Sequence, residues 1–313
     1  MVQHGNQRPA AWPDGLPAGA HMDDQVVLVY GGTGTQGTPV VEQLLAAGRN
    51  VRVLTRDAAR AEHWRSRGAA IVVADLGDPE SLAAANDGVS QVVLQLPLQY
   101  DFDLHETYGR NAVDAARAAG VDLLVFNTSA QVIQNTEVHA YQARQVVIDY
   151  LHGSGVPSVV LRPTFYMEIL LGPWIRPAIV NDSVVAFPLP ADLPMSWISA
   201  FETAGHAVAA LARPDLAGRE FDIGGPQALT GNDLAACFAT ALNRPIQFVS
   251  ISPDDYEQSL APIFGPTVAR EVAAQVRCII DLGSGAVDMA SPRSEFSVAP
   301  KSLDDWIAGH DWQ

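Results

Sequence analysis

The sequence predicts an α/β fold, a doubly wound parallel sheet with a small C-terminal substrate or lid domain. From residue 25 onward, short apolar runs alternate with helix-like segments six times in succession. The runs are apolar nearly throughout, as strands are when helices cover both faces of a sheet. Single helices between successive strands imply right-handed crossover connections, and these join parallel strands.

The expected strands and helices follow one another along the chain with clear boundaries. We expect strands at 26–30, 51–55, 70–74, 91–95, 123–128 and 158–161, and helices between them at 38–47, 58–67, 105–119 and 139–152. Each of these helices stops at a glycine, the residue preferred where a helix ends in the left-handed conformation. Another helix is expected between Asp78-Pro79, a cap followed by proline at the first helical position, and Gly88.

After Leu161 the regular alternation of strands and helices ends, because the segment 162–202 is rich in prolines and aromatic residues. Beyond it we expect a helix at 204–211, a strand at 220–223 and helices at 230–242, 254–260, 267–280 and 302–308. Thr230 and Asp233 form a capping box for the helix at 230–242.

These boundaries predict three parts of the chain. Residues 1–24 are expected to be a disordered leader, rich in Gly, Pro, Ala and Gln and without the features of a signal peptide. The sheet domain takes 25–162 plus about 203–225, and the lid takes 163–202 plus about 226–313. Ligands of open α/β sheets bind at the carboxyl ends of the strands, which the lid is expected to cover.

A glycine-rich turn follows the first strand directly and opens the first helix. It reads Gly31-Gly32-Thr33-Gly34-Thr35-Gln36-Gly37 and fits both G-x-x-G-x-x-G and G-x-G-x-x-G. In either register the glycines let the backbone approach a pyrophosphate, and the helix N-terminus offers N–H groups to it. A glycine-rich turn without a ligand is the alternative, but the surrounding βαβ units favour a Rossmann-type dinucleotide site. Its expected contacts are Gly31, Thr33, Gly34, Thr35, Gln36 and Gly37.

Arg56 follows the second strand, where an NAD-specific protein places an acidic residue on the adenosine ribose. Because a guanidinium pairs with a 2′-phosphate and stacks on adenine, Arg56 predicts NADP(H) as the cofactor. The alternative is an exposed arginine paired with Asp57. Asp75, after the third strand, is expected to accept a hydrogen bond from the adenine amino group, or to serve only as a loop or capping carboxylate.

The stretch 29–88, with GGTGTQG, VRVLTRD and ADLGDPESL, resembles the NmrA-like family of atypical short-chain dehydrogenases/reductases. The likeness continues through 121–129, 161–165 and 221–225. The resemblance implies an NADP(H)-binding Rossmann domain with a small C-terminal substrate domain. Members of the family include quinone and other reductases, and also regulators that bind the dinucleotide without turning it over.

The catalytic centre departs from the pattern of short-chain dehydrogenases, a serine with Tyr-x-x-x-Lys. Arg144 stands where the resemblance places the lysine, and Ala140 stands where the tyrosine belongs. Tyr141 is one residue away, which turns its side chain by about 100° around a helix. Arg144 is expected to hold the nicotinamide ribose or a substrate oxygen, or else to be a solvated arginine on the helix surface. Ser129 is expected to bind a substrate carbonyl, or to cap the next segment.

Other proton donors are expected near the same edge of the sheet. Tyr166, after the sixth strand, is the best placed of them, and His139 and Tyr141 are alternatives, although a structural role is the simpler interpretation of each. The aromatic residues Phe165, Trp174 and Trp197 are expected to shape an apolar pocket, unless they only pack.

The bulk properties exclude several classes of function. A formal net charge of −16 and a pI near 4.7 argue against nucleic acid as a partner. No apolar run approaches the roughly 20 residues of a membrane span. The two cysteines, Cys237 and Cys278, lack metal-ligand spacing and are expected to be buried thiols. We expect a cytoplasmic protein without a metal.

The leading prediction is a reductase that transfers a hydride from NADPH to a small apolar carbonyl, quinone, enone or imine, without the Tyr-x-x-x-Lys relay. An NADP(H)-sensing regulatory protein without turnover is the second hypothesis, and a redox-neutral biosynthetic enzyme is the third. Apart from this small-molecule substrate, a homodimer is expected by analogy alone.

Overall fold

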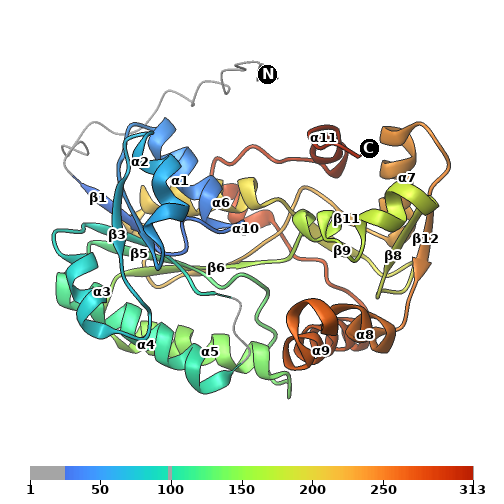
Figure 1. The fold of residues 1–313 in the computed structure, drawn as a ribbon. Helices are drawn as coiled ribbons and strands as arrows, with labels where there is room; N and C mark the ends of the chain where they lie inside the picture. Colours follow the sequence, from blue (N-terminus) through green and yellow to red (C-terminus); the bar gives the residue numbers. More distant parts are fainter. Residues whose placement is uncertain (1–24, 98–100, 313) are drawn as a thin grey trace.

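The computed structural model describes residues 25–97 and 101–312, so the expected leader lies outside the described residues. In this part of the chain, seven parallel strands form the central sheet in the order β10-β6-β5-β4-β1-β2-β3 (Figure 1). They are β1 (Val26–Val29), β2 (Asn50–Thr55), β3 (Ala70–Val73), β4 (Gln91–Gln95), β5 (Leu123–Asn127), β6 (Ser158–Pro163) and β10 (Glu220–Ile223). The strand order reverses at β1, between β2 and β4, which is the switch point where ligands bind in such sheets.

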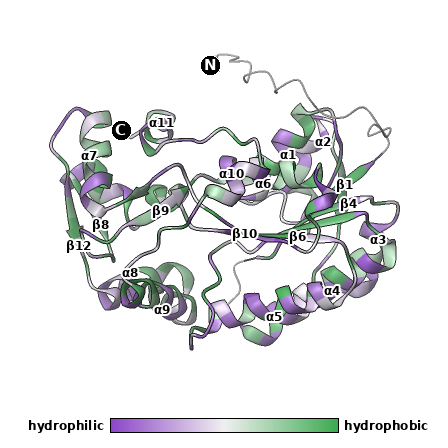
Figure 2. Cartoon of the chain, turned by 180° about the vertical axis from the view of Figure 1, so that it is seen from behind, coloured by the Kyte–Doolittle hydropathy of each residue, from purple (hydrophilic) through white to green (hydrophobic). Residues whose placement is uncertain are grey.

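Helices cover both faces of the sheet, as the apolar strands predict. On one face lie α1 (Gly37–Ala46), α2 (Glu62–Arg65) and α6 (Ala200–Leu211), and on the other lie α3 (Pro79–Asn86), α4 (Phe102–Ala119) and α5 (His139–Gly153) (Figure 1). Hydrophobic and hydrophilic residues alternate along α4 and α5 (Figure 2), so each presents an apolar side to the sheet. Fully buried valines and leucines of the strands fill both interfaces. The predicted α/β fold is confirmed.

Local sequence sets most of the helix ends. The Asp78 side chain accepts from the backbone N–H groups of Glu80 and Ser81 and caps α3 as expected. Gly120 ends α4 in the left-handed conformation. The helix expected over 58–67 is instead a 3₁₀ turn, Ala58–Ala61, followed by the single-turn α2.

A second group of elements packs beside the carboxyl edge of the sheet. Its helices are α7 (Gly231–Leu242), α8 (Pro253–Phe264), α9 (Pro266–Leu282) and α11 (Leu303–Ala308), whereas α10 (Ala290–Glu295) packs on β10 of the central sheet. Its strands are β7 (Phe165–Tyr166), β8 (Val184–Phe187), β9 (Met195–Ile198), β11 (Ala228–Leu229) and β12 (Gln247–Ser250), and short helical turns occupy Met167–Leu171 and Ala178–Asp182. A third turn, Pro214–Leu216, contacts α6 and β6 of the sheet domain. The sequence does not predict these strands, because runs of two to four residues carry too little periodicity.

The aromatic residues of this part form its core rather than a pocket. Trp197 is 1% exposed and packs edge-on against Phe165 and Phe187. Trp174 packs edge-on against Phe264 in the same way. The expectation that Phe165, Trp174 and Trp197 shape a pocket is therefore replaced by packing, the alternative.

Two further expectations concern the membrane and the cysteines. None of the helices in the described ranges combines the length and the hydrophobicity that spanning a bilayer requires. Cys237 and Cys278 are free thiols, and both are half-buried rather than buried as expected.

Candidate cofactor and active site

The main candidate site is a cavity of about 720 Å³ along the carboxyl ends of β1 to β5. Its size lies within the range of small-molecule and cofactor sites. Its walls include every residue predicted to contact the cofactor, namely Gly31, Thr33, Gly34, Thr35, Gln36, Gly37, Arg56, Asp75 and Arg144, and also Ser129. The topology thus brings the ends of five strands to one cavity at the switch point of the sheet.

The glycine-rich turn forms the floor of this cavity between β1 and α1. Gly31 has a φ of +66°, and its carbonyl oxygen accepts the Gly34 N–H at 2.9 Å. Gly37 packs directly on the Gly31 carbonyl, where a Cβ atom would collide with it. The buried Trp64 indole N–H donates to the Gly32 carbonyl oxygen at 3.1 Å. The turn is therefore closed internally and held from α2, while the N-terminus of α1 opens toward the cavity.

Two arginines, Arg56 and Arg60, line the end of the cavity beside β2 and β3. Both are exposed, and Arg60 was not predicted. The Asp57 carboxylate caps the 3₁₀ turn that follows, because it accepts the Ala59 N–H at 2.9 Å. Among the described residues no ion pair joins Arg56 to Asp57, so the geometry does not support that alternative for Arg56.

Asp75 follows β3 and also lines the cavity. One of its carboxylate oxygens accepts the Gly77 N–H at 2.7 Å. Asp75 therefore has the loop role that was one of its two expected roles. It also remains part of the cavity wall.

Ser129 and Arg144 line the opposite end, at β5 and α5. Ser129 has a φ of +64° and donates its N–H to the Asn127 side chain at 2.9 Å. A serine in this left-handed region is uncommon and stores strain of a kind that clusters at functional sites. Arg144 is 5% exposed and donates to the carbonyl oxygens of Thr128 at 2.9 Å and Ala140 at 2.5 Å. The alternative of a solvated surface arginine is therefore wrong.

Tyr166 lies behind the glycine-rich turn and does not line the cavity. Its hydroxyl donates to Gln36 Oε1 at 3.2 Å and accepts from Asn127 Nδ2 at 3.3 Å. Burial raises the pKa of the Tyr166 hydroxyl far above its ordinary value. This geometry suits a side chain that positions Gln36 rather than one that reaches a substrate.

The two alternative donors on α5 also lie outside the cavity walls. Tyr141 is 2% exposed, within the core. His139 is exposed and lies 3.3 Å from Glu271 of α9, which also accepts the Ala140 N–H. Glu271 therefore joins the start of α5 to the lid.

Several cavity residues were missed by the sequence reasoning. Gln95 ends β4, and its buried side-chain Nε2 lacks a hydrogen-bond partner within the described part of the chain. His105 and Tyr108 reach the cavity from α4. The position of Gln95 at a strand end was the only sequence signal for this group. The Gln95 amide lacks a partner and lies beside the glycine-rich turn. A polar ligand such as a dinucleotide could supply the missing hydrogen bond.

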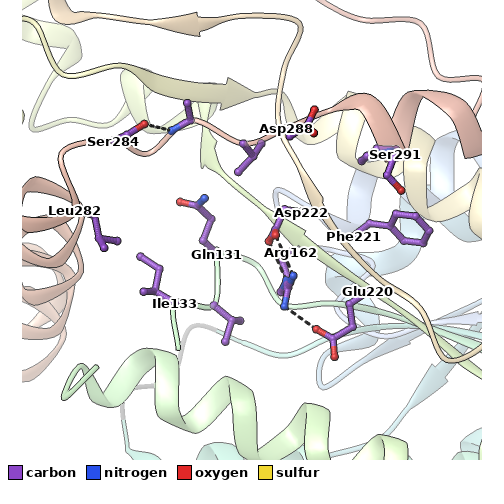
Figure 3. A pocket seen from close by; sticks show the side chains of 14 residues that line it. Gln131, Ile133, Arg162, Glu220, Phe221, Asp222, Leu282, Ser284, Asp288 and Ser291 are labelled. Carbon is purple, nitrogen blue, oxygen red and sulfur yellow. Dashed lines mark hydrogen bonds and ion pairs between the residues drawn. The ribbon is translucent and has the colours of Figure 1, made fainter. Parts of the chain in front are cut away.

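A second cavity of about 470 Å³ lies beside the edge strand β10 (Figure 3). Figure 3 shows Arg162 bonded to Asp222 and Glu220, and the Arg162–Asp222 contact is bidentate at 2.9 Å. The Ser284 hydroxyl likewise accepts the Ala286 N–H at 3.1 Å. In the described residues, none of the buried polar atoms without a partner belongs to this cavity, whereas the larger one holds Gln95 and His105. The larger cavity is the stronger candidate site.

Comparison with known proteins agrees with this geometry. A model of the NmrA-like family matches residues 23–307. An NAD(P)H azoreductase of Xenophilus azovorans is 33% identical over 236 residues, which are 75% of this chain and 80% of the relative. A (4-alkanoyl-5-oxo-2,5-dihydrofuran-3-yl)methyl phosphate reductase of Streptomyces griseus is 32% identical over 250 residues, 78% of this chain and 83% of the relative.

Among solved structures, the triphenylmethane reductase of Citrobacter sp. in complex with NADP(H) has the same fold. The two align with a TM-score of 0.77 and 18% sequence identity, over 91% of this chain and 99% of that one. The names of these proteins agree with the predicted cofactor class and with a reductase.

Proposed function

Because the chain belongs to the NmrA-like family, we propose that it is an NADPH-dependent reductase of small apolar electrophiles. The substrate classes are carbonyls, quinones, enones and imines, and the azoreductase relative adds the azo bond. The observation that carries the proposal is the 720 Å³ cavity, which joins the glycine-rich turn to two arginines at one end and to Ser129 and Arg144 at the other.

The cavity residues divide into three groups toward a bound dinucleotide. The turn from Gly31 to Gly37 holds the pyrophosphate through backbone N–H groups and the N-terminus of α1. Arg56 and Arg60 hold the 2′-phosphate, with Asp75 beside the adenine. The Gln95 side-chain amide donates a hydrogen bond to another polar group of the dinucleotide.

At the other end, Ser129 and Arg144 act on the nicotinamide side. When bound, NADPH supplies the hydride. The Ser129 hydroxyl orients the acceptor oxygen or nitrogen of the substrate. Arg144 stabilises negative charge that develops there, because its guanidinium is buried and stays protonated. Tyr166 has a positioning role in this proposal, through its bond to Gln36.

The experiment is a turnover assay of the purified chain with NADPH and a panel of azo dyes, quinones, enones and imines. We expect loss of NADPH absorbance with at least one class, and slower loss with NADH. Binding of NADPH without turnover across the whole panel would contradict the reductase. That outcome would favour the sensing protein, the second hypothesis, or a redox-neutral enzyme.

A further inference from the structure

His105 stands out among the walls of the cofactor cavity. It lies in the first turns of α4 and is only 6% exposed. Both of its ring nitrogens are buried and lack a hydrogen-bond partner among the residues that the structure describes. An unsatisfied buried donor or acceptor costs about 1–3 kcal/mol, so two on one ring indicate that a ligand supplies their partners.

A second buried histidine in the same chain provides the contrast. His206 of α6 is 3% exposed, and its Nδ1 bonds to the Glu202 carbonyl oxygen at 2.9 Å. Its ring also packs edge-on against Phe296, with the centroids 5.7 Å apart. His206 therefore has the environment of a structural core histidine. His105 has neither kind of contact and borders a cavity instead.

The electrostatics of the cavity keep His105 neutral. Burial lowers the pKa of the His105 imidazole to about 4, and the positive charge of Arg144 contributes to this shift. A neutral imidazole carries one N–H donor and one acceptor nitrogen. It can therefore accept a proton on one nitrogen while it releases the proton of the other, without a stable charged form.

We propose that His105 relays a proton from water to the substrate reduced in this cavity, in place of the absent tyrosine. This inference rests on the proposed reductase function. Each hydride added to a C=O, C=N or N=N bond leaves an anionic oxygen or nitrogen that takes up one proton. The N–H bond of one His105 nitrogen breaks as the proton moves to that atom, and the other nitrogen takes up an H⁺ from the solvent, so one solvent proton is consumed for each hydride transferred. The ring ends in its other neutral tautomer, and exchange with water restores the first.

The test compares His105→Gln and His105→Ala with the control His206→Gln. A general acid contributes roughly 100-fold or more, so we expect kcat of both His105 variants to fall by at least that factor. The Kd for NADPH, measured by fluorescence without substrate, should stay near the wild-type value. Added imidazole should restore part of kcat in His105→Ala but not in His105→Gln, where the side chain fills the space. His206→Gln should keep the wild-type kcat.

A measurement independent of turnover uses nitrogen-15 labelled histidine in the wild-type protein. We expect the two His105 ring nitrogens to shift when a substrate from the panel is added to the protein saturated with NADP⁺, while those of His206 do not move. Unmoved His105 signals would overturn the relay even if a variant failed to fold. A wild-type kcat in a folded His105 variant, or a loss confined to the Kd for NADPH, would also overturn it and leave the reductase standing. If the wild-type protein reduces none of the compounds in the panel, both the reductase function and the His105 relay are contradicted.

Discussion

Arg56 and Arg60 approach the same end of the cofactor cavity from one short segment. Arg56 follows β2, and Arg60 lies in the 3₁₀ turn that comes next. The Asp57 carboxylate between them caps that turn by accepting the Ala59 N–H. In the proposed function, both guanidinium groups bind the 2′-phosphate.

We therefore expect Arg56→Ala and Arg60→Ala each to weaken NADPH binding by roughly 10- to 100-fold, as for a lost hydrogen bond to a charged group. NADH lacks the 2′-phosphate, so its Kd should change little. Titration of protein fluorescence with each dinucleotide measures both constants, and Arg65→Ala on the nearby α2 is the control. Equal losses for NADPH and NADH would sink the assignment of both residues.

Single residues also explain where the sequence reasoning about the catalytic centre was limited. Arg144 was placed by counting along a helix, and it does line the cavity. Tyr166 was placed by topology alone. It follows β6 at the carboxyl edge of the central sheet, but it lies in β7, which pairs with β9 in a separate small sheet, and its hydroxyl bonds to Gln36 and Asn127. Side-chain direction at the end of a two-residue strand depends on the packing around it.

At the scale of elements, the β1–turn–α1 unit depends on one close approach of backbone to backbone. The Cα of Gly37 packs on the Gly31 carbonyl, so any side chain there pushes α1 away from β1. The Trp64 indole N–H of α2 stabilises the same turn by donating to the Gly32 carbonyl oxygen.

Gly37→Ala should lower the free energy of unfolding by about 1–3 kcal/mol, the usual effect of overpacking, and should abolish detectable NADPH binding. Gly153→Ala at the end of α5 is the matched control, because a Cβ atom there meets no atom within 4 Å. Urea denaturation and dinucleotide titration report the two effects. If Gly37→Ala binds NADPH as the wild type does, the turn is not the pyrophosphate site.

At the scale of the whole molecule, buried ionisable groups couple stability to pH. Glu202, in the first turn of α6, is 4% exposed, and burial raises the pKa of its carboxyl to about 8. Burial lowers the pKa of His105 and of His206 to about 4. Folding thus keeps a proton on Glu202 and keeps protons off both histidines.

The signs of these shifts define two pH windows. The folded state binds more protons than the unfolded state at Glu202 between pH 4.5 and 8, so this contribution to stability is lost as the pH rises toward 8. At the histidines the folded state binds fewer protons between pH 4 and 6.5, so their contribution is lost as the pH falls. Above pH 6.5 the histidines no longer contribute to the pH dependence of stability, and the contribution of Glu202 remains.

We therefore expect the free energy of unfolding to fall by about 2 kcal/mol between pH 6.5 and 8. Glu202→Gln should flatten this dependence, because the amide does not titrate. Glu80→Gln, an exposed glutamate in the first turn of α3, should leave it unchanged. Urea denaturation at both pH values measures the slope, and an unchanged slope in Glu202→Gln would refute the role of this carboxyl.

The parallel sheet, its covering helices and the glycine-rich turn can all be predicted from local sequence patterns. These features depend on periodicity, on caps such as Asp78 and on glycines, all of which act between residues close in the chain. The same local logic placed Arg56 and Asp75 at strand ends, and parallel strands bring such ends to one edge.

Which side chains face the cavity, and which pack away from it, depends on contacts between segments that are distant in the sequence. Gln95, Arg60 and His105 reach the cavity from three different elements, and no local pattern marks their convergence. The small strands of the lid form because distant segments pair, as β7 does with β9. Burial is a property of the whole molecule, since His105 and His206 are the same residue type on two helices. Their surroundings alone make one a core residue and leave the other unpartnered beside the cofactor cavity.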